Sequence, residues 1–150
     1  MKEYPLDPDV QAAIAGQARL YAETDGKEGG WVEEPGQPPA PVLLLTTRGR
    51  RTGQPRTTPL IFGRDGSDYL VVASLAGYDK SPQWYLNLLA EPRAEIQVLA
   101  ERLAVTARSA DADERERLWR LMSEVYPTYE TYQAATSRAI PVVVLAPAAD

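Results

Sequence analysis

The stretch TTRGRRTGQPRTTP, residues 46–59, decides how this chain is organised. It holds four arginines, two glycines and five threonines, and it contains no acidic residue. Its net charge is +4, whereas the whole chain carries −5, so the remaining residues carry −9. Arginine side chains match phosphate and carboxylate oxygens, glycines let a backbone approach an anion, and hydroxyls add donors. The stretch therefore indicates a local anion site; a solvated basic turn between two strands is the alternative.

The composition of the chain restricts its chemistry. With 150 residues, 44% of them hydrophobic, it is long enough for one domain, residues 1–150, with a sizeable core. It has no cysteine and no histidine, which excludes a disulfide framework, the usual zinc sites and a Ser-His-Asp triad. Catalysis must therefore depend on tyrosine, serine, lysine, arginine or carboxylate side chains, or on a bound cofactor, and we expect no metal site.

The acidic balance of the chain, with a pI near 4.8, argues against nucleic acid as a partner. The first ten residues, MKEYPLDPDV, contain no apolar signal core, and no apolar run approaches the length that spans a membrane. We therefore expect a cytoplasmic protein with no integral membrane segment.

An N-terminal helix and a long loop, together residues 1–41, precede the first strand. The spacing of apolar residues predicts a helix from Asp9 to Tyr21. Residues 24–41, which we call the arm, hold four glycines and four prolines, a composition typical of a loop. Trp31 and Val32 lie within the arm, where they either pack it against the domain or cover a ligand.

Six apolar or alternating segments are predicted as strands: residues 42–45, 57–62, 69–74, 94–99, 102–108 and 142–145. The first three should form an antiparallel meander, with turns at the basic stretch and at Arg64–Ser67. Because successive strands reverse direction, Ser74 should lie next to the arginines of the basic stretch. Ala100-Glu101 is predicted as a two-residue turn between the fourth and fifth strands.

Helices are predicted between and after these strands. One covers residues 82–90 with Ser81 as its N-cap, and another opens with a capping box made by Asp111 and Glu114. A third follows the break at Pro127. Short antiparallel strands with few helices predict an α+β fold built on a small closed or split barrel. The dinucleotide and P-loop glycine motifs are both missing from the sequence.

Aromatic side chains recur at helical spacing in two places. Tyr126, Tyr129 and Tyr132 stand three residues apart, and residues 84–87 combine two aromatics with an asparagine. Such stripes are usually core packing. With no histidine or cysteine in the chain, however, tyrosine is its best remaining neutral proton donor, and an amide beside two rings could hold a planar heterocycle. Both interpretations remain open from the residues alone.

Five motifs follow one another along the chain: LLLTTRGRRTGQPRTTPL at 43–60, VAS at 72–74, KSPQWYLNL at 80–88, YPTYETYQ at 126–133 and IPVVVL at 140–145. Through these motifs, in order and in register from about Gly29 to Pro147, the chain resembles the deazaflavin (coenzyme F420)-dependent nitroreductases of actinobacteria, the Ddn-like proteins. Each motif is moderately specific, and together they are strongly so.

The resemblance implies a split β-barrel of about six mainly antiparallel strands with flanking helices, related to flavin-reductase-like FMN-binding proteins. It also implies the reduced coenzyme F420 (F420H2) as cofactor. The side chain of this coenzyme carries a phosphodiester and a glutamate tail, which suits the basic stretch found independently above.

The resemblance further implies which residues form the site. Tyr129 and Ser74 would orient or protonate the substrate, and Tyr126 and Tyr132 would border its pocket. The positions that would contact the coenzyme are Arg50, Arg51, Thr52, Arg56, Thr57, Thr58, Pro59, Leu60, Ile61, Val72, Ala73, Ser74, Leu75, Gln83, Trp84, Tyr85, Leu86, Asn87 and Tyr129.

The chain departs from the family pattern at two places. Arg51 stands where many members have lysine, and Leu75-Ala76-Gly77 replaces a common Lys-Gly-Gly. The second change removes a positive contact and puts activity on nitroimidazoles in doubt.

We interpret the chain as an F420H2-dependent oxidoreductase that transfers a hydride to a quinone, an activated enone or a nitroaromatic. The alternatives are an FMN-dependent reductase of the same barrel and a non-catalytic deazaflavin or flavin-binding protein. The partner would be a small-molecule hydride acceptor. A homodimer, and peripheral contact with the inner face of the cell membrane for access to quinones, are left open.

Overall fold

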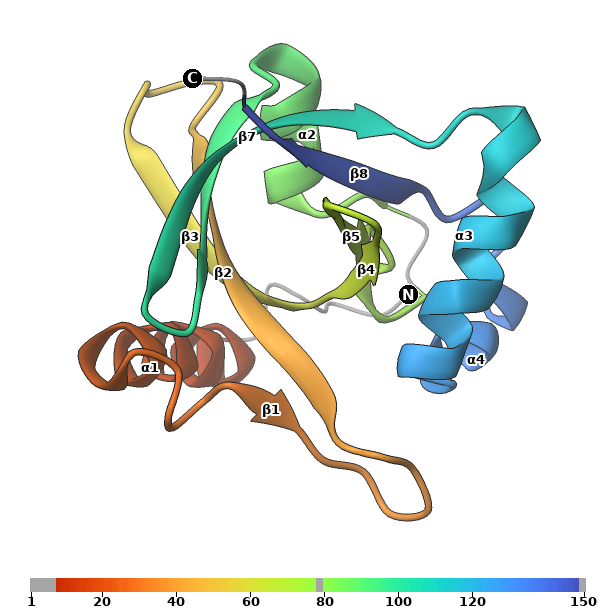
Figure 1. Ribbon diagram of the computed structural model, residues 1–150, viewed down its shortest axis with the longest axis horizontal. Coiled ribbons are helices and arrows are strands. Elements are labelled where there is room, and N and C mark those ends of the chain that lie inside the picture. The colour runs from red at the N-terminus through yellow and green to blue at the C-terminus, as the bar shows by residue number, and fades with distance from the viewer. Residues whose placement is uncertain (1–7, 78–79, 149–150) are drawn as a thin grey trace.

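The computed structural model describes residues 8–77 and 80–148, and in this part of the chain four α-helices surround a curled antiparallel sheet of eight strands (Figure 1). The helices are α1 (Pro8–Thr24), α2 (Gln83–Ala90), α3 (Ala112–Val125) and α4 (Thr128–Ala134). The strands are β1 (Trp31–Val32), β2 (Ala40–Arg48), β3 (Pro55–Ile61), β4 (Gly63–Asp65), β5 (Asp68–Val72), β6 (Arg93–Val98), β7 (Glu101–Ser109) and β8 (Val142–Pro147). A short 3₁₀ turn, η1 (Leu75–Gly77), follows β5.

One bent segment closes the barrel. β3 pairs with β2 along all of its seven residues. After Phe62 the chain continues as β4, which pairs with β5 on the other side of the ring, with Gly63 opposite Leu70. The other neighbours run in the order β2, β6, β7, β8, β5. Residues 55–65 therefore complete the ring of strands that is visible in Figure 1.

The apolar run of β2 is explained by burial on both faces. Leu43 and Leu45 belong to one buried cluster that is shared by five strands, whereas Val42 and Leu44 pack with Tyr21 of α1. A strand covered on both sides needs apolar residues at consecutive positions, not only at alternate ones. Helix α1 covers the second face of β2, and β2 therefore has apolar residues at consecutive positions, whereas a half-exposed strand has them only at alternate positions.

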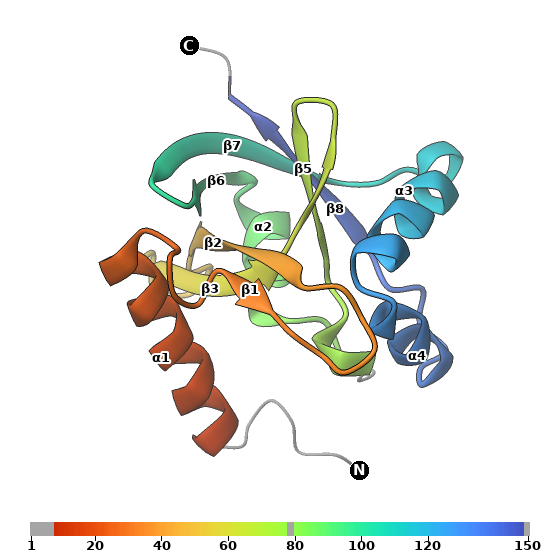
Figure 2. The ribbon, with the colours of Figure 1, turned by 60° about the horizontal axis from the view of Figure 1, so that its bottom comes forward.

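A second buried cluster holds α3 and α4 against the sheet. Leu118 and Met122 of α3 pack with Leu70 and Val72 of β5 and with Val144 of β8. Helix α1 lies at one side of the barrel and the α3–α4 pair at the other, as Figure 2 shows. The space between these two helical layers is where the functional residues gather.

The structure confirms the predicted α+β split barrel. It also confirms the capping box, because the Asp111 side chain accepts from the N–H of Glu114 while the Glu114 side chain accepts from the N–H of Asp111. The predicted cap Ser81 is wrong: α2 begins at Gln83 after Pro82, with no side-chain capping bond.

Three further details differ from the sequence prediction. The arm contains a strand, β1, whose two residues pair with Ala40 and Pro41. The predicted meander is interrupted, because its second strand pairs with β2 only as far as Ile61 and then turns towards β5. The β6–β7 turn lies one residue earlier than expected, at Leu99-Ala100, with Leu99 at a φ of 55°.

No helix in residues 8–77 and 80–148 is long and apolar enough to cross a membrane.

Candidate functional site

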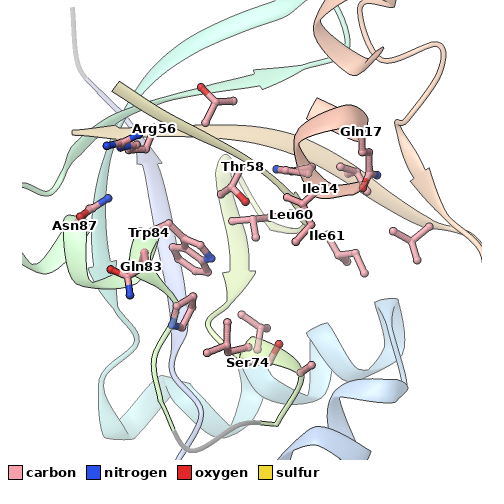
Figure 3. A pocket seen from close by; sticks show the side chains of 18 of the residues that line it. Ile14, Gln17, Arg56, Thr58, Leu60, Ile61, Ser74, Gln83, Trp84 and Asn87 are labelled. Carbon is pink, nitrogen blue, oxygen red and sulfur yellow. The ribbon is translucent and has the colours of Figure 1, made fainter. Parts of the chain in front are cut away.

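A cavity of about 720 Å³ opens between β3, the end of β5, α1, α2 and α4 (Figure 3). This volume lies within the usual range for small-molecule sites. The structure brings most of the predicted site residues into its lining: Arg50, Arg51, Thr52, Arg56, Thr57, Thr58, Pro59, Leu60, Ile61, Val72, Ser74, Leu75, Gln83, Trp84, Asn87, Tyr126, Tyr129 and Tyr132.

The basic end of the cavity is a tight turn between β2 and β3. Gly49 donates its N–H to the carbonyl of Gln54 at 2.8 Å, and its own carbonyl accepts from the N–H of Gly53 at 2.8 Å. Gly53 has a φ of 74°, a conformation that favours glycine. A Cβ at Gly49 would lie only 3.0 Å from the Thr52 hydroxyl, so the turn is compact. It carries the arginines at the edge of the cavity.

Arg50 fastens this turn to α2. Its backbone N–H and Nη1 both donate to Oδ1 of Asn87, at 3.2 and 2.9 Å, and Nη2 donates to Oε1 of Gln83 at 2.8 Å. Nδ2 of Asn87 donates in turn to the hydroxyl of Thr47 at 3.2 Å. Much of the donor capacity of Arg50 is therefore used to hold α2 beside the hairpin.

The remaining hairpin arginines differ in their surroundings, because Arg48 helps to lower the pKa of the Glu91 carboxyl, whereas Arg51 and Arg56 meet no carboxylate in the described residues. None of the five ion pairs within residues 8–77 and 80–148 uses Arg48, Arg50, Arg51 or Arg56. Arg51 and Arg56 are exposed, and neither has a hydrogen-bond or ion-pair partner in the described part of the chain. Figure 3 shows Arg56 at the end of the cavity where Asn87 also lies. An anion placed there would meet two free guanidinium groups without displacing a carboxylate.

Helix α2 presents alternate faces to the cavity and to the barrel exterior. Gln83, Trp84 and Asn87 line the cavity. Tyr85 and Leu86, which the resemblance places at the coenzyme, are not among the lining residues. The Tyr85 hydroxyl instead shares a hydrogen bond of 2.9 Å with the Ser109 hydroxyl on β7. Five consecutive helical residues span more than one turn, so their side chains cannot all point to the same side, which a motif read along the sequence does not show.

Ser74 lies at the start of a left-handed turn. Leu75, Ala76 and Gly77 have φ angles of 45°, 53° and 80°, and such angles are unfavourable for residues with a Cβ. Nη2 of Arg138 donates to the carbonyls of Ala73 and Ser74, at 3.1 and 2.8 Å.

The Arg138 contacts fix the backbone that carries Ser74 into the cavity. Ala73 itself does not line the cavity, because it is fully buried in the barrel core with Val71 and Trp84. Its N–H donates to the carbonyl of Pro141, and its own carbonyl accepts from Arg138.

The three tyrosines form one aromatic wall. Tyr126 and Tyr129 meet edge to face, with ring centroids 5.0 Å apart, and Tyr132 lies 6.2 Å from Tyr129. Burial raises the pKa of the Tyr129 phenol well above its ordinary value, and the neighbouring Tyr132 adds to the rise. No hydrogen-bond partner of the Tyr129 hydroxyl is found among the residues the structure describes. Tyr129 is thus a neutral phenol at the cavity with an uncommitted proton.

Val32, which the sequence analysis considered as a cover over a ligand, lines the cavity. Sequence reasoning missed six further lining residues: Ile14, Gln17, Val42, Gly49, Ala76 and Pro82. Gly49 and Pro82 are immediate neighbours of predicted residues, so the motif boundaries could have included them. Ile14 and Gln17 carry no such signal, because their place depends on how α1 packs against β3. Gln17 is held there by a hydrogen bond from its Nε2 to the carbonyl of Gly29, at 3.0 Å.

Fold and cavity together define a split-barrel protein suited to a planar cofactor with an anionic tail. The family described as F420H(2)-dependent quinone reductase matches residues 14–147, and the chain belongs to this family. The F420H(2)-dependent quinone reductase Rv1261c of Mycobacterium tuberculosis is 46% identical over 129 residues, which cover 84% of each chain. The comparisons confirm the resemblance to the actinobacterial F420-dependent proteins.

Solved structures support the same fold. A structure described as an F420-H2 dependent reductase (FDR-A) has a TM-score of 0.65 and 39% identity, covering 69% of this chain and 92% of that one. Another, described as a domain-swapped dimer, has a TM-score of 0.67 and 33% identity over 93% of this chain and 99% of that one. An FAD-binding protein of Mesorhizobium loti, 12% identical with a TM-score of 0.52 over 72% of this chain and 79% of that one, shares the fold alone.

Because Ala76 has a positive φ, we expect Ala76→Gly to stabilise the protein, the opposite of the usual effect of this substitution. Ala76→Gly should raise the free energy of unfolding by roughly 0.5–1 kcal/mol, because relief of strain at a positive φ exceeds the added entropy of the unfolded chain. Ala13→Gly in α1 is the matched control and should lower it by about 1 kcal/mol. Arg138→Met should destabilise the chain, and less so with Ala76→Gly present. Urea unfolding measures all four variants; a destabilising Ala76→Gly would contradict the role of strain.

Proposed function

We propose that this chain uses reduced coenzyme F420 to reduce quinones. The observation that carries the proposal is the pair of unneutralised arginines, Arg51 and Arg56, at one end of a cavity with an aromatic and apolar interior. Membership of the F420H(2)-dependent quinone reductase family supports it from the sequence side. Cofactor and substrate would share one cavity between the hairpin and the tyrosine wall.

The residues present fit the coenzyme. Free guanidinium groups suit a phosphodiester and carboxylates, and the Thr52, Thr57 and Thr58 hydroxyls add donors. Further inside, Leu60, Ile61, Val72 and Trp84 offer flat apolar surface for a ring system. Arg51 and Arg56 would hold the tail, so that binding energy far from the reacting atoms positions the ring.

When bound, the reduced coenzyme supplies a hydride. The acceptor gains that hydride and a proton, and the chain must hold or admit the proton. Tyr129 holds a proton at the cavity, because burial raises the pKa of its phenol above the ordinary value and keeps it neutral. Ser74, 9% exposed and fixed at its carbonyl by Arg138, would orient the acceptor with its hydroxyl. The buried rings of Tyr126 and Tyr129 would exclude water from this end.

Two other functions deserve a direct test against this one. Enones and nitroaromatics are also electron-poor acceptors, so the first experiment is an F420H2-oxidation assay over quinones, enones and nitroaromatics. Fluorescence titration with F420 and with FMN separates a deazaflavin enzyme from an FMN-dependent reductase. Tight F420 binding without turnover of any acceptor would favour a non-catalytic carrier.

A homodimer is part of the proposal, supported by the 33% identical relative described as a domain-swapped dimer. Sedimentation equilibrium decides this, and a monomer at all concentrations would contradict it. A cytoplasmic location, with peripheral membrane contact for quinone access, also stays a prediction, which fractionation of cells expressing the chain would test.

Arg56→Ala tests the anion site. It should weaken binding of full-length F420 by about 1.5–3 kcal/mol, the range for a charge-assisted hydrogen bond. The loss should be much smaller for a truncated deazaflavin that lacks the phosphate and glutamates. Arg102→Ala, which removes a surface arginine paired with Glu95, is the matched control and should leave both affinities unchanged. Equal losses of affinity for the two ligands would show that Arg56 supports the fold and does not contact the tail.

Tyr129→Phe tests the proton donor. Coenzyme affinity should stay within about threefold, whereas turnover should fall by about 10²-fold if the phenol donates in the rate-limiting step. A residue that only orients the acceptor would change mainly KM. We expect a larger defect with enones than with quinones, whose oxygens can be protonated later from water. Tyr85→Phe, which changes a residue outside the cavity lining, is the control. Unchanged kinetics in Tyr129→Phe would show that the Tyr129 ring has only a packing role.

A further inference from the structure

The arm contacts the tyrosine wall through one carboxylate. Oε1 of Glu34 accepts a short hydrogen bond from the Tyr126 hydroxyl, and Oε2 accepts from the Thr128 hydroxyl at 2.8 Å. Nε2 of Gln37 completes the group, donating to Thr128 at 2.9 Å and to Glu34 at 3.3 Å. Residues about 90 positions apart in the sequence are thus joined at the entrance to α4.

These contacts determine where the Tyr126 proton points. A phenol has one O–H, and a carboxylate oxygen can only accept. In the described structure the Tyr126 proton is directed at Glu34, which is not among the residues that line the cavity. Tyr126 therefore faces an acceptor molecule only with its ring and its oxygen lone pairs. Tyr129, whose hydroxyl has no such partner in the described residues, keeps its proton for the cavity.

The same contacts fix the shape of the wall. Tyr126 packs edge to face on Tyr129, so a shift of one ring displaces the other. Val32, two residues before Glu34, lines the cavity beside them. Arm and tyrosines therefore form one continuous surface, and Glu34 is the charged group that joins its two halves.

We infer that Glu34 is a positioning residue for the hydride acceptor: it holds Tyr126 and the arm in place, and leaves Tyr129 as the phenol that can donate a proton. The inference rests on the proposed function, because it assigns the tyrosine wall to the acceptor. It predicts that the acceptor site and the coenzyme-tail site respond separately to substitution. Arg51 and Arg56 belong to a different end of the cavity and make no contact with Glu34.

The central experiment compares Glu34→Ala with Glu33→Ala, a matched control whose carboxylate is exposed and outside the cavity lining. Glu34→Ala should raise KM for a quinone about fivefold to thirtyfold, because a buried phenol loses its acceptor, while the Kd of F420 stays within about twofold. Glu34→Gln keeps one accepting oxygen, so its KM for the quinone should lie between those of Glu34→Ala and the unmodified chain. Glu33→Ala should match the unmodified chain.

A double-mutant cycle separates positioning from general destabilisation. If Glu34 acts through Tyr126, adding Tyr126→Phe to Glu34→Ala should raise KM by no more than about twofold further, since both remove the same contact. Fully additive effects would overturn the inference. If Glu34→Ala does not fold, Thr128→Val keeps the side-chain volume and removes one donor; it should still raise KM, and an unchanged KM would overturn the inference.

Hydrogen exchange of the arm tests the contact without any turnover. Amides of residues 31–40 should exchange at least about tenfold faster in Glu34→Ala than in Glu33→Ala. Equal exchange and equal KM in these two variants would overturn the inference. Loss of protection in a chain that oxidises no F420H2 would instead contradict the proposed function and leave the Glu34 contact established.

Discussion

The pairing of one bent segment with two different strands is the constraint on which the rest of the structure depends. Residues 55–65 pair with β2 at one end and with β5 at the other, and thereby close the barrel. Arg56 lies near its start, Pro59 to Ile61 line the cavity, and Gly63 packs against α3. A Cβ at Gly63 would lie 2.6 Å from the Met122 sulfur, so helix and strand are in direct contact. Anion site, apolar wall and helical layer therefore have fixed relative positions.

The two ends of the cavity differ in their electrostatics. At the hairpin end, Arg51 and Arg56 lack carboxylate partners within the described residues, and Arg50 binds α2 through Asn87 and Gln83. At the other end, phenols are buried and neutral. Such an arrangement separates binding from chemistry, since a charged group holds one part of a ligand while neutral donors meet the reacting part.

The parts of the fold that the sequence predicts well are those that local sequence patterns encode. The Asp111 capping box and the apolar strands are encoded within a few residues, and the hairpin charge is visible in composition. The cofactor followed from family resemblance, because arginines alone recognise many phosphates and carboxylates. Ile14 and Gln17 could not be placed, since the docking of α1 is tertiary. The Glu34–Tyr126 contact links residues far apart in the sequence, and no local sequence pattern at either position predicts it.

Because the chain contains no histidine, the proton chemistry of the cavity lining is restricted. Among the described residues, the polar lining consists of arginines, amides, hydroxyls and phenols, with no carboxylate. Arginine loses its proton only at very high pH, and burial moves the pKa of Tyr129 further above its ordinary value. Within the described residues, the lining therefore contains none of the side-chain types, histidine, cysteine, aspartate and glutamate, that ordinarily titrate below about pH 9. A ligand that titrates near neutral pH therefore meets no histidine, cysteine or carboxylate in this lining with which it could exchange a proton.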